Sequence, residues 1–143
     1  MIMNPHRFII VDDDPINNLI CKEFIRLTVR EPHHVVDFTS PEKALEYIFS
    51  WEKPASREMP VVIFLDLNMP TMSGWEFITQ FEKLPQETRD NFHIYIVSSS
   101  INPADLELAA TNPRVKEYVI KPVGETFIRK LIDEAEGWQK TAG

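Results

Sequence analysis

The sequence predicts an α/β fold in which helices cover both faces of a parallel sheet. Short apolar runs alternate with amphipathic segments along the chain, which is the pattern of repeated strand–helix–strand units. The runs FIIV and VVIFL are continuously apolar, as is typical of strands buried on both faces. With 143 residues, 43% of them hydrophobic, the chain is long enough for one domain with a substantial core.

Five segments have the length and composition of strands. They span 8–11, 34–38, 61–66, 94–98 and 117–121. The third, VVIFLD, has the strongest apolar character, so we expect it to be the most deeply buried strand. Right-handed crossovers between successive strands would make the sheet parallel.

Five helices are predicted after these strands. They begin at Pro15, Pro41, Gly74, Pro103 and about residue 124, and the last one extends to about residue 140. Ser40 and Asn102 precede two of these prolines and are suited to cap the helices, because their side chains accept from free N–H groups of the first turn. The apolar stripe Trp75, Phe77, Ile78 and Phe81 is interpreted as core packing.

Composition disfavours several classes of function. The net charge is −7 and the lysines and arginines are scattered, which argues against a nucleic-acid-binding surface. No apolar run approaches the roughly 18 residues that a membrane span needs. Cys21 is the single cysteine and has no disulfide partner, so we expect a reducing, cytoplasmic environment.

The strand–helix alternation continues without a repeat or a linker. We therefore expect one domain over residues 1–143, with a core over roughly 6–140 and no output domain. The polar stretch at 50–60, which contains two prolines, is predicted to be a loop. The sequence assigns no role to this loop.

Polar residues stand at the carboxyl ends of four predicted strands. They are Asp12, Asp13 and Asp14 after the first strand, Asp66 at the third, Ser98, Ser99 and Ser100 at the fourth, and Lys121 at the fifth. The carboxyl ends of parallel strands meet at one edge of the sheet, which is where ligands bind in open α/β folds. The sequence therefore predicts a functional site that combines carboxylates, hydroxyl groups and a cation.

This set of groups suits phosphoryl chemistry. Carboxylates at close range need a proton or a cation to compensate their charge. Oxygen ligands favour a hard ion such as Mg²⁺, which leaves places for waters and a phosphoryl group. An aspartate can act as the nucleophile and form an acyl phosphate, while a lysine and a hydroxyl contact phosphoryl oxygens. We interpret the acids as a metal site that serves a phosphoryl group.

Four segments, IIVDDDP, FLDLNMPTMSGWEF, IVSSS and YVIKP, resemble the motifs of the two-component response-regulator receiver domain. The motifs occur in the same order as in that family and are spread over nearly the whole chain. In this respect the chain resembles a stand-alone, single-domain response regulator. The resemblance implies a flavodoxin-like, doubly wound, five-stranded parallel sheet with strand order 2-1-3-4-5 and five helices.

The resemblance also implies roles for individual residues. Asp66 would be the phosphoacceptor, and Pro122 would follow its neighbour through a cis peptide bond. The metal site would comprise Asp12, Asp13, Asp66 and the backbone carbonyl of Asn68, with Asp12 acting through water and Mn²⁺ able to replace Mg²⁺. The phosphoryl-binding and switch residues would be Ser98, Ser99, Lys121 and Tyr118.

By the same resemblance the chain would be a signalling protein and not an enzyme, although it would catalyse its own phosphorylation and dephosphorylation. The phosphoryl group would come from a phosphohistidine on a sensor histidine kinase or a histidine phosphotransfer protein. The face around Tyr118 would then switch and bind a downstream protein, with the chain a monomer or a weak dimer. Nucleic acid and membrane are not expected partners.

Some alternative interpretations stay open. A degenerate receiver could act as a constitutive binding module, although the complete set of acids, hydroxyl and lysine argues against it. An aspartate-nucleophile phosphatase would need a second aspartate two residues after the nucleophile, where this chain has Asn68. Asp14 could cap the first helix or act as an outer-shell metal residue. Tyr118 taken alone would be an ordinary half-buried strand aromatic.

Overall fold

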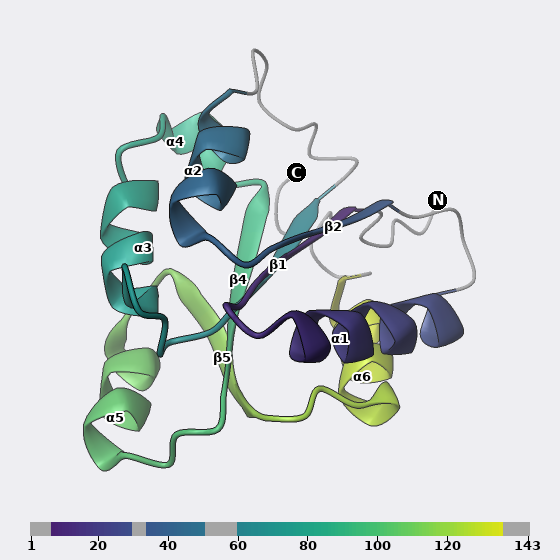
Figure 1. Ribbon diagram of the computed structural model, residues 1–143. Helices are drawn as coiled ribbons and strands as arrows, with labels where there is room; N and C mark the ends of the chain where they lie inside the picture. Colours follow the sequence, from purple (N-terminus) through teal and green to yellow (C-terminus); the bar gives the residue numbers. More distant parts are fainter. Residues whose placement is uncertain (1–6, 30–33, 51–59, 136–143) are drawn as a thin grey trace.

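The computed structural model describes residues 7–29, 34–50 and 60–135. It contains one parallel sheet of five strands in the order β2-β1-β3-β4-β5, which confirms the predicted fold class and strand order. Figure 1 shows helices on both sides of this sheet. In the described part of the chain, no helix is both long enough and apolar enough to cross a membrane.

The element bounds are close to those expected from the sequence. The strands are β1 Arg7–Val11, β2 His34–Phe38, β3 Val61–Leu65, β4 Phe92–Ser98 and β5 Val115–Ile120. The helices are α1 Pro15–Thr28, α2 Pro41–Phe49, α3 Gly74–Phe81, α4 Gln86–Arg89, α5 Pro103–Thr111 and α6 Glu125–Ala135. The expected loop at 50–60 and the expected end of the last helix lie largely outside the described residues.

The sheet divides the interior into two apolar cores, because successive side chains of a strand point to opposite faces. On one face, α2 and α3 pack against alternate residues of the central strands, such as Ile9 and Ile63. On the other face, α1 and α6 pack against the intervening residues, such as Phe8 and Phe64. All five residues of β3 are buried, as its apolar run predicted.

Side chains at the helix starts explain where several helices begin. The carboxylate of Asp14 accepts a hydrogen bond from the backbone N–H of Ile16, so Asp14 caps α1. Ser40, Ser73 and Asn102 cap α2, α3 and α5 in the same way. The capping interpretation of Asp14 is therefore confirmed.

Helix α4 is an addition to the five expected helices. Its four residues, QETR, contain no apolar periodicity, so the hydrophobic pattern could not reveal it. Tertiary contacts hold it: Arg89 forms an ion pair with the Glu82 carboxylate and donates to the Glu82 carbonyl at 3.0 Å. Arg114 donates to the same carboxylate at 2.7 Å. These partly buried ion pairs connect α4 to residues outside it, and contacts of this kind cannot be read from local helix propensity.

Candidate functional site

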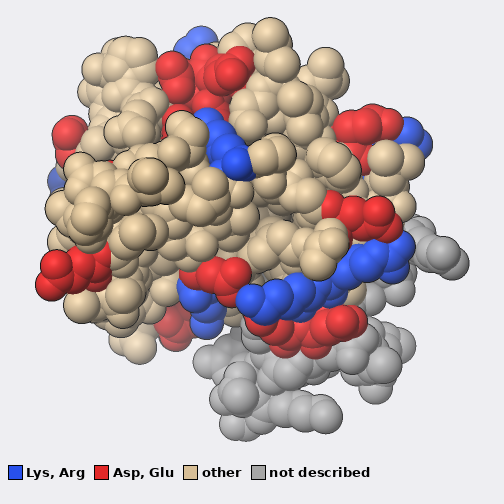
Figure 2. Space-filling model, turned by 90° about the horizontal axis from the view of Figure 1, so that it is seen from below, with Lys and Arg blue, Asp and Glu red and all other residues tan. Residues whose placement is uncertain are grey.

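Backbone hydrogen bonds bring the predicted site residues to one edge of the sheet. The Asp66 N–H donates to the Val11 carbonyl at 2.9 Å, one residue beyond the paired ends of β1 and β3. The Lys121 N–H donates to the Ser98 carbonyl at 3.0 Å in the same way. Figure 2, seen from the side to which the strand ends point, shows acidic side chains gathered beside a basic one.

Three carboxylates form the centre of this site. Oxygen atoms of Asp12, Asp13 and Asp66 lie within 4.8 Å of one another. Asp12 and Asp66 are buried, with exposed fractions of 2% and 4%, whereas Asp13 is exposed. No hydrogen-bond donor from the described ranges contacts the Asp13 carboxylate. An all-oxygen donor set with one open carboxylate fits a hard divalent cation such as Mg²⁺.

The Asp12 carboxylate is held by several donors. Its Oδ1 accepts from the Asp14 backbone N–H at 2.9 Å, and its Oδ2 accepts from the Asn17 amide at 2.7 Å. The ammonium group of Lys121 lies 2.8 Å from the same Oδ2. These contacts compensate the charge of a buried carboxylate, which would otherwise be costly.

The Asp66 carboxylate is less well compensated. Burial raises its pKa from an ordinary 3.8 to about 6, and the negative charges of Asp12 and Asp13 add to the rise. Lys121 and the backbone N–H of Asn68 oppose it. The Lys121 Nζ is 3.5 Å from Asp66 Oδ1, farther than from Asp12. Asp66 is thus a carboxylate in an electrostatically strained position, as often found at functional sites.

Lys121 is the cation of the site and lies just beyond the end of β5. Burial lowers its pKa, but the hydrogen bond and charge of Asp12, together with Asp66, outweigh this effect, so the pKa lies above its ordinary value. Because its pKa is raised, the ammonium group remains charged while it bridges the two acids. The peptide bond from Lys121 to Pro122 is cis.

Ser98 is fully buried at the end of β4, and its Oγ accepts from the backbone N–H of Ser100 at 3.1 Å. The Ser98 hydroxyl proton is not used by this bond. Ser99 is exposed beside it. Tyr118, half-buried on β5, donates its hydroxyl to the Ser100 carbonyl at 2.7 Å. Ser100 thus connects the buried serine with the tyrosine.

A glycine is required where the loop after Asp66 turns into α3. The Gly74 N–H donates to the Leu67 carbonyl at 2.9 Å, which pulls the start of the helix close to the strand end. A Cβ at Gly74 would lie 2.7 Å from the Asp66 carbonyl oxygen, a distance that side chains do not tolerate. This close approach explains the glycine in SGWEF.

The sequence did not reveal two groups of contacts around the site. Asn17 and Asn18, in the first turn of α1, both contact Asp12; the Asn18 amide donates to its carbonyl at 3.0 Å. Two adjacent asparagines next to an acidic run, one of them fully buried, were the available signal. Such a buried polar residue inside an amphipathic helix needs a polar partner.

The second group of contacts involves Trp75, which was interpreted as core packing. Its ring does pack against the core, but it is only partly buried and its indole N–H donates to Asp105 at 3.2 Å. The Ser100 hydroxyl donates to the other Asp105 oxygen at 3.1 Å. The first turns of α3 and α5 are therefore joined through one carboxylate.

Comparison with known proteins agrees with this geometry. The family model described as response regulator receiver domain matches residues 8–133. A response regulator receiver protein from Dyadobacter fermentans is 28% identical, with a TM-score of 0.77 and coverage of 90% of this chain and 96% of that one. A two-component response regulator from Cytophaga hutchinsonii is 27% identical, with a TM-score of 0.77 and coverage of 93% and 97%. The chain belongs to the response regulator receiver domain family.

A curated relative adds a point about length. The probable methanogenesis regulatory protein FilR2 of Methanothrix harundinacea is 27% identical over 104 residues, which are 70% of this chain and 64% of that protein. The chain thus spans less than two thirds of this relative.

Proposed function

We propose that this receiver domain accepts a phosphoryl group on Asp66 in a two-component or phosphorelay signalling system. The observation that carries the proposal is the position of Asp66: it is buried, its pKa is raised to about 6, and it lies between two further carboxylates and a lysine. A purely structural carboxylate would be placed in water or fully paired. The Asp66 carboxylate is instead buried beside other acids, where a bound cation would compensate its charge.

In the proposed reaction a carboxylate oxygen of Asp66 attacks the phosphorus atom of a phosphohistidine. A P–O bond forms while the P–N bond breaks, and the imidazole leaves with the electron pair and takes up a proton. Lys121 and the Ser98 hydroxyl bind the phosphoryl oxygens. Asp13, Asp66 and the Asn68 carbonyl would hold Mg²⁺, or Mn²⁺, with Asp12 acting through water. Such an ion supplies neutralisation of the negative charge that develops during transfer.

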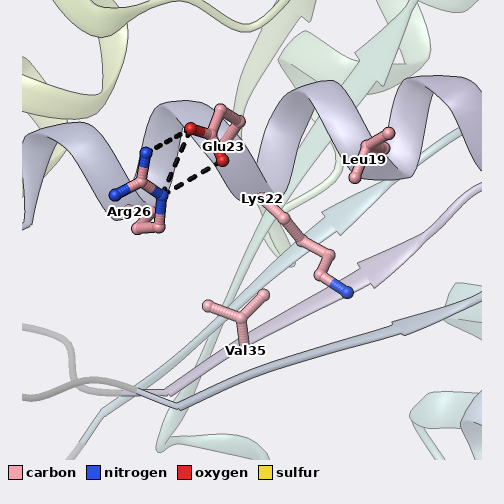
Figure 3. A pocket seen from close by; sticks show the side chains of 5 residues that line it. All are labelled: Leu19, Lys22, Glu23, Arg26 and Val35. Atoms are coloured by element: carbon pink, nitrogen blue, oxygen red, sulfur yellow. Dashed lines mark hydrogen bonds and ion pairs between the residues drawn. The ribbon is translucent and has the colours of Figure 1, made fainter.

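The proposed phosphodonor is a sensor histidine kinase or a histidine phosphotransfer protein, and α1 supplies a surface for it. Ile16, Leu19, Ile20 and Leu27 are all exposed on this helix, with Ile16 directly after the acidic run. A groove of about 260 Å³ lies between α1 and β2. Figure 3 shows that Leu19, Lys22, Glu23 and Arg26 of α1 line it together with Val35 of β2. Its charges are already paired, Lys22 with Asp37 and Arg26 with Glu23, so it suits an apolar partner helix more than a small ion.

The proposed output surface lies on the other side of the site, around Tyr118. Large apolar side chains are exposed on α5 and the adjoining strand and loop; they are Ile101, Leu106, Leu108 and Ile120. Tyr118 points inward and holds Ser100, so a movement of Ser100 would release it. We infer that this face binds a downstream protein, and that the domain works in the cytoplasm, in keeping with its buried, unpaired Cys21.

Intact mass spectrometry tests the proposal. After incubation with acetyl phosphate and Mg²⁺, the wild-type chain is expected to gain the mass of one phosphoryl group, and Asp66→Asn is expected to gain none. Omission of Mg²⁺ should abolish or strongly slow labelling of the wild type. Equal labelling of the variant would place the nucleophile elsewhere, and an unlabelled wild type would favour a constitutive binding module.

A further inference from the structure

The Asp12 carboxylate has one oxygen with two side-chain donors. Oδ2 accepts from the Asn17 amide at 2.7 Å and is paired with the Lys121 ammonium at 2.8 Å. Asn17 comes from the first turn of α1, whereas Lys121 comes from the loop after β5. The two donors therefore reach the same atom from different elements, and one can leave while the other stays.

Lys121 is the donor that has to leave. Its Nζ is closer to Asp12 than to Asp66, at 2.8 Å against 3.5 Å. The proposed function requires Lys121 to pair with oxygens of a phosphoryl group on Asp66. An ammonium group that turns toward the phosphoryl weakens its contact with Asp12 Oδ2, at the moment when the orientation of Asp12 matters for the cation.

Asn17 is fixed well enough to remain. Asp14 caps the helix that carries it, and the neighbouring Asn18 amide holds the Asp12 carbonyl at 3.0 Å. Asn17 and Asp12 are thereby held at a set distance by the helix start itself. The amide is also neutral, so it donates a hydrogen bond without adding a positive charge that would compete with a divalent cation.

We propose that Asn17 is a positioning residue that keeps the Asp12 carboxylate oriented toward the cation when Lys121 transfers to the phosphoryl group. This inference rests on the proposed function, because it presumes a cation at the acids and a phosphoryl group at Asp66. It assigns to Asn17 no contact with substrate. Groups that hydrogen-bond to a metal-binding carboxylate, and so fix its orientation, commonly change metal affinity by about tenfold or more.

Binding of Mg²⁺ to four proteins tests the inference: wild type, Asn17→Ala, Lys121→Met and the double variant. Affinity is measured by isothermal titration calorimetry and by the dependence of melting temperature on Mg²⁺. Lys121→Met is expected to bind more tightly than wild type, because a competing cation is gone. Asn17→Ala should weaken binding by about threefold in the wild-type background and by about tenfold in the Lys121→Met background, where no other side chain holds Oδ2.

Equal fold-changes in the two backgrounds would overturn the inference, since Asn17 would not be taking over from Lys121. If Asn17→Ala lowered the melting temperature by the same amount at every Mg²⁺ concentration, the inference would also be overturned, because the role of Asn17 would then be only structural. Asn17→Leu, which keeps the size without the donor, replaces Asn17→Ala if that variant does not fold.

Two controls separate this inference from the proposed function. Thr111→Ala, a polar truncation on α5 whose hydroxyl bonds to carbonyls of its own helix, should leave Mg²⁺ affinity unchanged, and Asp13→Ala should abolish most binding. A wild type that neither binds Mg²⁺ nor becomes labelled by acetyl phosphate contradicts the proposed function. If the wild type does both and Asn17→Ala binds Mg²⁺ as tightly as the wild type, only the role of Asn17 is contradicted.

Discussion

At the scale of single residues, Asp66 combines a cost to folding with a proposed role as phosphoacceptor. Its carboxylate is 4% exposed, and its pKa is raised from 3.8 to about 6, by burial first and by Asp12 second. Because the folded state raises this pKa, the protonated form favours folding. The favourable contribution is complete below pH 3.8 and is lost as the pH rises through about 6.

Asp66→Asn is therefore expected to stabilise the Mg²⁺-free protein at neutral pH. A shift of about two pKa units corresponds to roughly 3 kcal/mol, which is the upper limit for the gain in unfolding free energy at pH 7.5. At pH 4 the two proteins should differ little, because Asp66 is then protonated. Urea unfolding at both pH values measures the difference.

The exposed Asp133 on α6 offers a matched control for this measurement. Asp133→Asn removes the same charge at a site far along the chain from the acidic cluster and should give no comparable gain. The gain in unfolding free energy of Asp66→Asn over wild type should be larger at pH 7.5 than at pH 4. An equal gain at both pH values would mean that Asp66 is not the strained carboxylate that its environment suggests.

At the scale of the elements, the loop from β4 to α5 connects the candidate site with the proposed output surface. Ser98 Oγ accepts from the Ser100 N–H, and the Ser100 carbonyl accepts from Tyr118. The Ser100 hydroxyl in turn donates to Asp105, which also binds Trp75 of α3. A displacement of Ser98 toward a phosphoryl group therefore moves a loop that is tied to β5, α5 and α3 together.

Ser98→Ala is expected to leave phosphorylation of Asp66 largely intact while it uncouples the loop. In the wild type, beryllofluoride with Mg²⁺, which mimics the phosphoryl group, should change amide hydrogen exchange across residues 99–120. The variant should show a much smaller change, because the hydroxyl that approaches the mimic is missing. Hydrogen-exchange mass spectrometry measures both proteins.

Thr111→Ala serves as the comparison for this experiment, since its hydroxyl bonds only to α5 carbonyls within the same segment. It should retain the wild-type response. Identical protection changes in the wild type and Ser98→Ala would mean that another group transmits the signal from Asp66 to Tyr118.

At the scale of the whole molecule, the site lies between two different apolar surfaces. Figure 1 shows α1 and α6 on one side of the sheet and α3 and α5 on the other. The exposed residues of α1 lie on the side where we propose that the phosphodonor binds, and those of α5 on the side of the proposed output. We therefore expect that substitutions on these two surfaces can separate the proposed input from the proposed output without changing the acids.

Leu19→Asp is expected to slow phosphoryl transfer from a protein donor by about tenfold, the effect of losing one well-packed interface residue. The donor is any purified histidine kinase or phosphotransfer protein that labels the wild type. Labelling by acetyl phosphate, which needs no docking surface, should be unchanged. Leu108→Asp on α5, similarly exposed, should alter neither rate. Equal slowing by both substitutions would show that α1 is not the donor surface.

Local sequence patterns were sufficient to predict a parallel α/β sheet and the edge that carries the candidate site, whereas the strand order was predicted from the family resemblance. Continuous apolar runs specify buried strands, and the residue that follows each run is placed at the sheet edge because parallel strands all end there. That rule alone brings Asp12, Asp66, Ser98 and Lys121 together. A capping carboxylate such as Asp14 is likewise a local feature, since its partner is two residues away.

Contacts between distant segments were decided only by the tertiary structure. Lys121 shares one oxygen of Asp12 with Asn17, and Asp105 joins Trp75 to Ser100, because packing of helices on the sheet brings these side chains within hydrogen-bond range. The raised pKa of Asp66 has the same origin, since burial and neighbouring charges act through space. Periodicity in a sequence tells which face a residue occupies, but the partner across the fold depends on distances that folding alone sets.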